Sequence, residues 1–263
     1  MIYLLDKDMG KYKGILLLTD FDGTLYTGSY IPQSNIDAIK RFCDDGGLFG
    51  FASGRTYKYF NKWEEVILPN TCISSVNGTV IYDYPSRRIV SERFMRADSF
   101  GKILQICRDH PHYLNITVFR RYSVIELDFD APDFSARLAE LMSDEVYKVM
   151  FHSKFPIGDA ERDEMQSFMG DDYYVSRSWK TGIEVQSSDS TKGASARQIK
   201  AISGADLLVC AGDYENDVTM IEAADIGYAV ENAIDGVKKV ADRRTVRVEE
   251  GAIAAIIDEL GSL

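Results

Sequence analysis

Four short polar segments could form a reaction centre: DFDGTL with Asp20 and Asp22, FASGRT with Ser53, STKG with Lys192, and GDYEND from Gly212. In the last segment Asp213, Asn216 and Asp217 have the spacing i, i+3, i+4, which on a helix places three side chains on one face. Acids, a hydroxyl and an amine in this combination suit phosphoryl transfer, a reaction that depends mainly on positioning and charge neutralisation.

The acids Asp20, Asp22, Asp213 and Asp217 carry more negative charge than one small pocket can hold. Two carboxylates about 4 Å apart repel by about 4 kcal/mol at an effective dielectric near ~20. Either some of the acids stay protonated or a hard divalent cation binds them. Because the segments offer oxygen ligands without clustered Cys or His, we expect Mg²⁺. Asp213 would complete its ligand shell, and Asp217 would support the ion directly or through water.

Each remaining side chain fits a role in the hydrolysis of a phosphate ester. Asp20, at the tip of a buried strand, is the candidate nucleophile that forms an aspartyl-phosphate. Asp22 is the candidate general acid for the leaving alkoxide, and then the base for the attacking water. We expect Ser53 to hydrogen-bond a phosphoryl oxygen, and Lys192 to neutralise another and to keep Asp20 ionised.

Buried strands deliver these segments to one edge of a predicted α/β sheet. The mostly apolar runs that indicate strands are 14–19, 48–53, 72–76, 206–211 and 226–230. Helices are predicted between or after them over 34–45, 57–66, 191–201, 214–223, 235–241 and 252–260. Strands that alternate with helices are typical of a parallel sheet, whose ligands bind beyond the carboxyl ends of the strands.

The pattern changes to an α+β order in the middle of the chain. Strands are predicted there over 88–94, 113–120, 123–128, 146–151, 173–178 and 182–185, and helices over 99–109, 134–142 and 159–168. We therefore expect residues 1–82 and 187–263 to form a catalytic core, with residues 83–186 inserted as a cap domain. Candidate specificity residues in the cap are Arg120, Arg121, His152 and Glu184.

Composition limits the partners of the chain. Its 263 residues are 45% hydrophobic, enough for a substantial core, and its net charge of -11 argues against a nucleic-acid partner. No apolar run could span a bilayer, and the first residues lack the apolar region of a signal peptide. Four cysteines without a C-x-x-C pair indicate reduced thiols. We expect a cytoplasmic monomer or weak homodimer that binds a small-molecule phosphate ester and no membrane; Ile2–Leu5 is either a short strand or a disordered lead-in.

The four segments, in this order, resemble the four motifs of the haloacid dehalogenase superfamily phosphatases. The large insertion after the second motif resembles the α/β cap of the Cof-type branch. Asn77-Gly78-Thr79 is similar to the Asn-Gly-Ala signature of that branch, and Glu231-Asn232-Ala233 is similar to its late Asn-Ala signature. The resemblance covers residues 14–80 and 187–241, and it implies a Rossmann-like three-layer core with a parallel sheet.

The resemblance also implies roles that the residues alone do not. The backbone carbonyl of Asp22 would ligate Mg²⁺, and Gly54 and Asn216 would help to hold phosphate or substrate. Two positions depart from the branch: Ser53 stands where Thr is common, and Thr79 replaces Ala. Either hydroxyl at the first position can bind phosphate, so the expected chemistry is unchanged.

Two positions keep two interpretations. Arg55 either binds a group on the phosphate side of the substrate or forms a salt bridge with an acid. Asn77 either binds substrate or, with Gly78, only forms a hairpin turn.

We therefore expect a Mg²⁺-dependent phosphatase of small phosphorylated metabolites, sugar phosphates foremost, that acts through an aspartyl-phosphate. A phosphosugar mutase of the same superfamily would use the same core to pass the phosphoryl group between substrate hydroxyls. A phospho-accepting signalling or binding module would also cluster Asp, Ser or Thr and Lys around Mg²⁺, but it would be shorter and would need no cap. A dinucleotide-binding protein is disfavoured, because no G-x-G-x-x-G follows the first strand.

Overall fold

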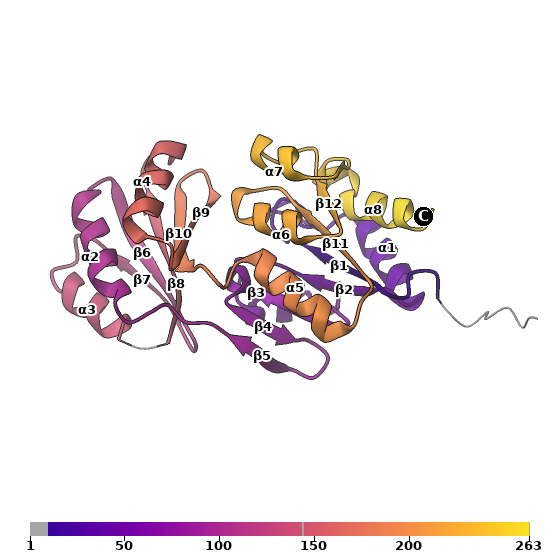
Figure 1. The fold of residues 1–263 in the computed structure, drawn as a ribbon, viewed down its shortest axis with the longest axis horizontal. Helices are drawn as coiled ribbons and strands as arrows, with labels where there is room; N and C mark the ends of the chain where they lie inside the picture. The colour runs from indigo at the N-terminus through magenta and orange to yellow at the C-terminus, as the bar shows by residue number, and fades with distance from the viewer. Residues whose placement is uncertain (1–9, 144, 263) are drawn as a thin grey trace, which may run out of the picture.

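The parallel sheet expected from the two ends of the chain is present in the computed structural model, which describes residues 10–143 and 145–262 (Figure 1). Its strands, all parallel, lie in the order β13-β12-β11-β1-β2. Their bounds are Ile15–Thr19 (β1), Leu48–Phe51 (β2), Leu207–Gly212 (β11), Ile226–Ala229 (β12) and Arg243–Arg244 (β13). The predicted α/β fold class is confirmed.

Helices cover both faces of this sheet, which explains why its strands are apolar on both sides. On one face Leu17 of β1 packs in a cluster with residues of α1 (Gln33–Asp44) and α8 (Ala252–Leu260). On the other face Leu16 and Leu18 pack with α5 (Lys192–Ser203), α6 (Val218–Ala223) and α7 (Asp235–Val240). The result is the expected three-layer core.

The segment from residue 72 does not extend the parallel sheet in the way we expected. β3 (Cys72–Ser75) forms a three-stranded antiparallel sheet with β4 (Val80–Asp83) and β5 (Arg88–Glu92), and it touches the parallel sheet through one bridge, Ala52 to Ser74. The reason is the tight turn η2 (Val76–Gly78), in which Val76 and Asn77 have φ of 52° and 57°. This turn sends the chain straight back along β3.

Three further expectations need correction or lie outside the description. The helix expected over 57–66 is a 3₁₀ helix, η1 (Tyr57–Trp63), and the helix expected over 214–223 is divided into η3 (Glu215–Asp217) and α6. A last 3₁₀ turn, η4 (Val248–Glu250), precedes α8. The Ile2–Leu5 segment lies outside the described residues. Within the described part of the chain, no helix has the length and apolar character to traverse a membrane.

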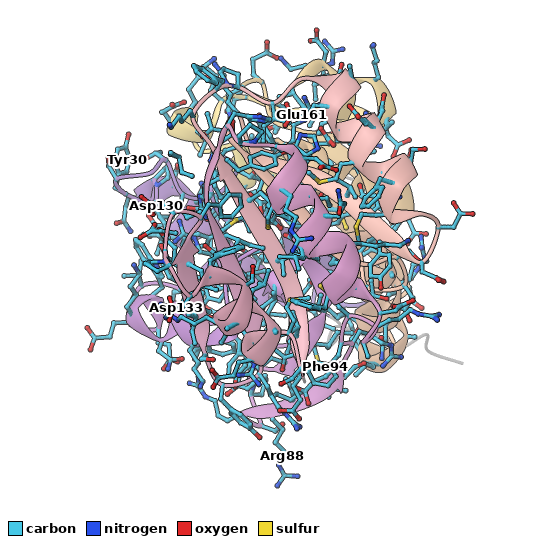
Figure 2. The ribbon with its side chains drawn as sticks, turned by 90° about the vertical axis from the view of Figure 1, so that its left-hand side faces the viewer. Tyr30, Arg88, Phe94, Asp130, Asp133 and Glu161 are labelled. Atoms are coloured by element: carbon cyan, nitrogen blue, oxygen red, sulfur yellow. The ribbon has the colours of Figure 1, made fainter. Side chains whose placement is uncertain are left out.

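A second, antiparallel sheet occupies the middle of the chain in the order β7-β6-β8-β10-β9. Its strands are Tyr113–Arg120 (β6), Val124–Asp128 (β7), Val146–Ser153 (β8), Tyr173–Trp179 (β9) and Gly182–Ser187 (β10). Three helices cover its outer face, the one toward the viewer in Figure 2: α2 (Ser99–Asp109), α3 (Phe134–Leu141) and α4 (Asp159–Met169). Figure 1 shows the opposite face of this sheet turned toward the parallel sheet.

Strand alternation divides the second sheet into two faces with different tasks. Val149, Phe151 and Ile183 lie in the apolar cluster under the helices. Their neighbours Lys148 and Glu184 therefore point to the other face, which is turned toward the parallel sheet (Figure 1). The chain enters this sheet after β5 and leaves it after β10, and the cap boundaries at 83 and 186 stay a prediction.

Candidate active site

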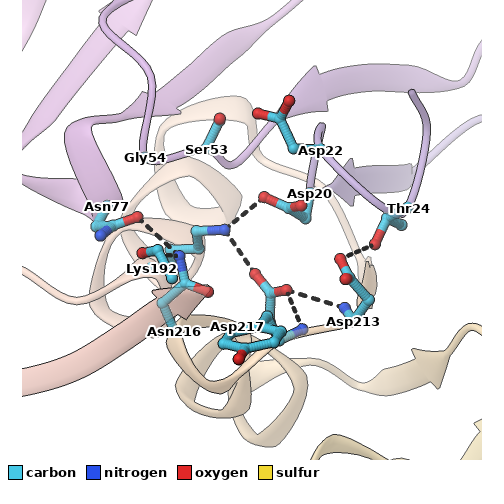
Figure 3. Close-up of polar contacts among 12 residues, drawn as sticks. Asp20, Asp22, Thr24, Ser53, Gly54, Asn77, Lys192, Asp213, Asn216 and Asp217 are labelled. Atoms are coloured by element: carbon cyan, nitrogen blue, oxygen red, sulfur yellow. Dashed lines mark hydrogen bonds and ion pairs between the residues drawn. The ribbon is translucent and has the colours of Figure 1, made fainter. Parts of the chain in front are cut away.

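The carboxyl edge of the parallel sheet collects the four motif segments (Figure 3). Asp20 directly follows β1 and Asp213 directly follows β11, two strands that pair with each other. Ser53 follows β2 after Ala52, and Lys192 is the first residue of α5. Because parallel strands end at one edge, residues that are far apart in the sequence become neighbours there.

Lys192 lies at the centre of the cluster. Its Nζ donates to Asp20 Oδ1 and to Asp217 Oδ1, at 2.6 Å each, and only 1% of the residue is exposed. The start of α5 is fixed by Thr191, whose hydroxyl caps the helix by accepting from Ala194 N at 3.2 Å. The buried ammonium and the two buried carboxylates stabilise one another, because a buried charge without a partner would be destabilising.

The GDYEND segment does not form the single helical face that its spacing suggested. Asp213 lies in the loop between β11 and η3, where Thr24 donates to its Oδ1 at 2.8 Å. Asp217 Oδ2 accepts from the backbone N–H groups of Asp213 and Tyr214, at 2.9 and 3.0 Å. Asn216 points elsewhere, toward Asn77. Asp213 and Asn216 separate because Asp213 precedes η3 and the backbone at Tyr214 is extended, so that Asp213 belongs to no helix.

Burial and mutual repulsion disturb the protonation of these acids. Burial raises the pKa of Asp20 well above its usual value; Lys192 opposes this, and Asp217 and Asp213 add to it. Burial and then Asp217 raise the pKa of Asp213 to about 7. Burial lowers the pKa of Lys192, but Asp20 and Asp217 outweigh it, so that its pKa lies above the usual value.

A divalent cation fits this arrangement. Asp20, Asp213 and Asp217 each offer a carboxylate oxygen, and these atoms lie within 4.8 Å of one another. Oxygen donors of this kind are those that Mg²⁺ prefers. The raised pKa values of Asp20 and Asp213 also indicate a cation. Without a metal, the positive charge in the site is too small to keep all of its carboxylates ionised.

Asp22 and Arg55 form the outer side of the site. Arg55 binds Asp22 with both ends of its guanidinium, with Nε to Oδ2 at 2.9 Å and a second contact to Oδ1 at 3.0 Å. The guanidinium also stacks over the ring of Tyr59, 4.3 Å from its centroid. Ser53 is buried, and its Oγ accepts from Arg55 N at 3.2 Å. Of the two interpretations of Arg55, this geometry displays the salt bridge.

Asn77 lies in the tight turn η2 and also contacts neighbouring residues of the site, and its binding of substrate stays a prediction. Its Oδ1 accepts from Asn216 at 3.2 Å, and its amide donates to Glu184 of the cap sheet. Glu184 in turn accepts from Lys148 Nζ at 2.7 Å, and Lys148 also reaches the carbonyl of Gly54 at 3.3 Å. Sequence reasoning missed Lys148, although a lysine in the otherwise apolar strand VYKVMF indicates a buried, paired charge.

A cavity of about 530 Å³ opens between the two sheets at this point. The predicted site residues that line it are Asp20, Asp22, Ser53, Gly54, Arg55 and Asn216. The cap contributes Phe119, Val124, Lys148, Met150, Ser178, Trp179 and Glu184. Of the four cap candidates only Glu184 lines the cavity; His152 is instead bonded to Thr117 at 2.9 Å, and Arg121 pairs with Glu92 and Glu145.

Comparison with known proteins agrees with this geometry. The sequence profile of the family described as haloacid dehalogenase-like hydrolase matches residues 17–257. The chain belongs to this family. The predicted enzyme class, a hydrolase with the motifs of this superfamily, is thereby confirmed.

Two curated members of the family illustrate the relationship. The chain is 24% identical over 277 residues to the 5-amino-6-(5-phospho-D-ribitylamino)uracil phosphatase YitU of Bacillus subtilis, covering 95% of this chain and 99% of the relative. It is 24% identical over 255 residues to the pyridoxal phosphate phosphatase YbhA of Escherichia coli, covering 86% and 91%.

Solved haloacid dehalogenase structures share the fold. The subclass IIB sugar phosphatase BT4131 superposes with a TM-score of 0.79 at 19% identity, over 94% of this chain and 99% of the other. A haloacid dehalogenase-like hydrolase from B. subtilis superposes with a TM-score of 0.78 at 21% identity, over 93% and 99%.

Proposed function

We propose that this hydrolase is a Mg²⁺-dependent phosphatase of small phosphorylated metabolites, including sugar phosphates, that acts through an aspartyl-phosphate. The observation that carries the proposal is the position of Lys192, whose ammonium lies 2.6 Å from both Asp20 and Asp217 at the carboxyl edge of the sheet. A lysine placed there favours the ionised form of the nucleophilic carboxylate, against the burial and the neighbouring acids that raise its pKa. The phosphatase names of the curated relatives support the reaction type.

In the proposed reaction, a carboxylate oxygen of Asp20 attacks phosphorus while the bond from phosphorus to the ester oxygen breaks. Asp22 gives its proton to the leaving alkoxide. Asp22 then takes a proton from water, whose oxygen attacks the phosphorus of the aspartyl-phosphate, and Asp20 leaves as a carboxylate. In this structure Arg55 holds both oxygens of Asp22 in a salt bridge, and this contact must open before Asp22 can carry the proton that it gives to the alkoxide.

The residues proposed to hold the metal are Asp20, Asp213 and the backbone carbonyl of Asp22, with Asp217 in support. When bound, Mg²⁺ would neutralise charge on the phosphoryl oxygens. Both oxygens of Asp217 already accept hydrogen bonds, from Lys192 and from the backbone of residues 213 and 214. We therefore assign Asp217 the task of holding Lys192 and the Asp213 loop in place.

The phosphoryl group and the rest of the substrate would be held by residues around the cavity. The proposed set is Ser53, Gly54, Arg55, Asn77, Lys192 and Asn216. The cavity volume of about 530 Å³ suits a metabolite with a small organic part. We further propose that the protein works in the cytoplasm as a monomer or weak homodimer, without nucleic acid or membrane.

Substitution of the proposed nucleophile tests the reaction. Asp20→Asn should abolish the release of phosphate from an aryl phosphate in the presence of Mg²⁺, while circular dichroism and thermal unfolding show a folded protein. Asp171→Asn, at an exposed cap position, is the matched control and should keep full activity. Turnover by Asp20→Asn at the wild-type rate would refute the assignment. Measuring isomerised sugar phosphate against released phosphate would separate this phosphatase from a mutase.

A further inference from the structure

A buried ion pair of the cap, Lys148 with Glu184, lines the cavity. The exposed fractions of the two side chains are 1% and 2%, and both residues line the cavity. Lys148 is on β8 and Glu184 on the neighbouring strand β10, where Glu184 pairs with Met150 and Lys148 pairs with Gln186. The two side chains therefore lie diagonally on the sheet face that looks toward the core. Burying two charges costs desolvation free energy that pairing alone often does not offset. A role of the pair beyond stability would explain its position.

Hydrogen bonds within the protein leave each member of the pair with unused capacity. The ammonium of Lys148 has three protons, and within the described part of the chain it donates to Glu184 Oε2 at 2.7 Å and to the Gly54 carbonyl at 3.3 Å. Glu184 Oε2 accepts from Lys148 and Asn77, whereas no residue among 10–143 and 145–262 hydrogen-bonds its Oε1. The Nζ of Lys148 also lies 4.5 Å from the centroid of the Phe119 ring, which lines the cavity too. One proton of Lys148 and Oε1 of Glu184 thus have no hydrogen-bond partner among the described residues.

The pair also lies close to where a phosphate would bind. Gly54, whose carbonyl Lys148 contacts, directly follows Ser53, and a Cβ built on Gly54 would be 3.5 Å from Lys148 Nζ. A group that contacts the pair would therefore belong to the first carbons of the leaving alcohol and not to a distant ring. The pair as a whole is neutral, so it favours a neutral polar group over a second anion.

We propose that Lys148 and Glu184 determine substrate specificity by binding a hydroxyl group on the carbons next to the phosphate ester. Lys148 donates a hydrogen bond to the hydroxyl oxygen, and Glu184 accepts the hydroxyl proton. This inference rests on the proposed phosphatase function, and it assigns the substrates to polyhydroxylated phosphate esters without a second acidic group nearby.

Three phosphate monoesters with a three-carbon skeleton test the proposal: sn-glycerol 3-phosphate, 3-phosphoglycerate and n-propyl phosphate. For the wild-type enzyme kcat/KM with glycerol 3-phosphate should exceed that with propyl phosphate by at least about tenfold, because a site built to bond a hydroxyl rejects the analogue without it. It should exceed that with 3-phosphoglycerate as well, because the neutral pair of Lys148 and Glu184 offers a carboxylate no net attraction. Equal kcat/KM values for all three esters would overturn the proposal.

Two variants then assign the selectivity to this pair. Glu184→Gln leaves the charge of Lys148 uncompensated. It should raise kcat/KM for 3-phosphoglycerate relative to kcat/KM for glycerol 3-phosphate by about tenfold. Lys148→Met combined with Glu184→Leu removes both hydrogen-bonding groups, and it should bring the ratio of kcat/KM for glycerol 3-phosphate to kcat/KM for propyl phosphate to about one. The matched controls are Lys102→Met and Glu161→Gln, two cap residues away from the cavity, which should keep the wild-type ratios.

The readouts separate this inference from the function on which it rests. A wild-type selectivity that persists in either variant would refute the role of the pair, even if Asp20→Asn is inactive. Activity that survives Asp20→Asn would refute the proposed reaction itself. Because the double variant could lose its fold, thermal unfolding accompanies it, and Glu184→Gln alone, which keeps an acceptor for Asn77, provides an independent test.

Discussion

A single ammonium group holds the acid cluster together. Lys192 contacts Asp20 and Asp217, and the buried cluster also contains Asp213, whose pKa is raised to about 7. Three carboxylates against one ammonium leave an excess of negative charge, which favours a bound cation. The energetic role of each side chain therefore depends on which charges around it are present.

Removing the ammonium should damage both stability and activity. Lys192→Met leaves Asp20 and Asp217 buried without their partner, and breaking such a pair costs about 3–5 kcal/mol. We expect kcat for an aryl phosphate to fall by at least about 10²-fold, because a preorganised charge at the reacting group is lost. Urea unfolding and steady-state kinetics measure the two effects. The control Lys180→Met, at an exposed position, should change neither; near-wild-type kcat in Lys192→Met would contradict the assigned role.

The raised pKa of Asp213 gives a pH signature in the metal-free protein. A carboxyl whose pKa is about 7 when folded and 3.8 when unfolded contributes stability at low pH that is lost as the pH rises from about 4 to about 7. Asp213→Asn lacks this loss. Between pH 4 and 7 in EDTA, the free energy of unfolding of the variant should therefore rise relative to that of wild type by about 1–4 kcal/mol.

With bound magnesium, wild type should be more stable than Asp213→Asn. At pH 8 with excess Mg²⁺, wild type gains stability from metal binding, whereas Asp213→Asn loses a ligand and gains less. Thermal unfolding with EDTA and with Mg²⁺ measures both conditions. A difference between the two proteins that is independent of pH in EDTA would show that Asp213 is not buried in a charged cluster.

At the scale of elements, the position of Lys192 depends on how closely α5 approaches α6. Gly193 follows Lys192, and a Cβ built on it would lie 2.1 Å from the carbonyl oxygen of Thr219. The Gly193 N–H also donates to the hydroxyl of Thr219 at 3.2 Å. Only a glycine permits this approach, so the sequence Lys-Gly at the start of α5 is a packing requirement as well as a motif.

A methyl group at this contact should move the amine of Lys192. Gly193→Ala forces α5 away from a backbone oxygen that cannot turn aside, and overpacking of this kind costs about 1–3 kcal/mol. We expect a lower midpoint of denaturant unfolding and a lower kcat with it. Gly101→Ala in α2 is the matched control, because a Cβ there meets nothing within 4 Å. In that variant the midpoint should stay the same or rise, since alanine favours the helix.

The elements also explain which parts of the site could be predicted from sequence. Asp20, Ser53, Lys192 and Asp213 could be placed together because each follows or begins an element whose pattern is clear, and parallel strands end at one edge. The sequence did not predict that β3 would pair in a separate antiparallel sheet. That outcome depends on the tight turn at Val76 and Asn77, two residues with positive φ. Lys148 was missed because its meaning depends on a partner, Glu184, that lies on another strand.

At the scale of the whole molecule, one core acid connects the two sheets. Glu215 of η3 is buried and accepts from Arg177 of β9 at 2.5 Å and from Arg162 of α4 at 3.2 Å. Its neighbour Asn216 donates to Ser178 of β9 at 3.1 Å. The segment that supplies acids to the site thus also holds the cap, so the position of the cap and the geometry of the acids are linked.

Neutralising this connection should make the cap more mobile. In Glu215→Gln, Arg177 and Arg162 lose their charged partner on the core and keep only Asp159 and Asp163 of the cap. We expect faster amide hydrogen exchange in β9 and α4 and a larger radius of gyration by small-angle scattering. Cap closure excludes water and completes the substrate site. The variant should therefore have a higher KM for a phosphate ester with a polar leaving group, by about 3–10-fold if one to two charge-assisted hydrogen bonds are weakened.

The opposite results have a definite meaning. Glu140→Gln, at an exposed position on α3, should leave exchange, scattering and KM unchanged and so controls for loss of charge on the cap. If Glu215→Gln raises KM while exchange in β9 and α4 stays at the wild-type rate, Glu215 acts on the neighbouring Asn216 and not on the cap. If exchange rises without a change in KM, the cap position shown here does not limit substrate binding. Only a rise in both hydrogen exchange and KM supports the conclusion that Glu215 holds the cap in position over the acid cluster.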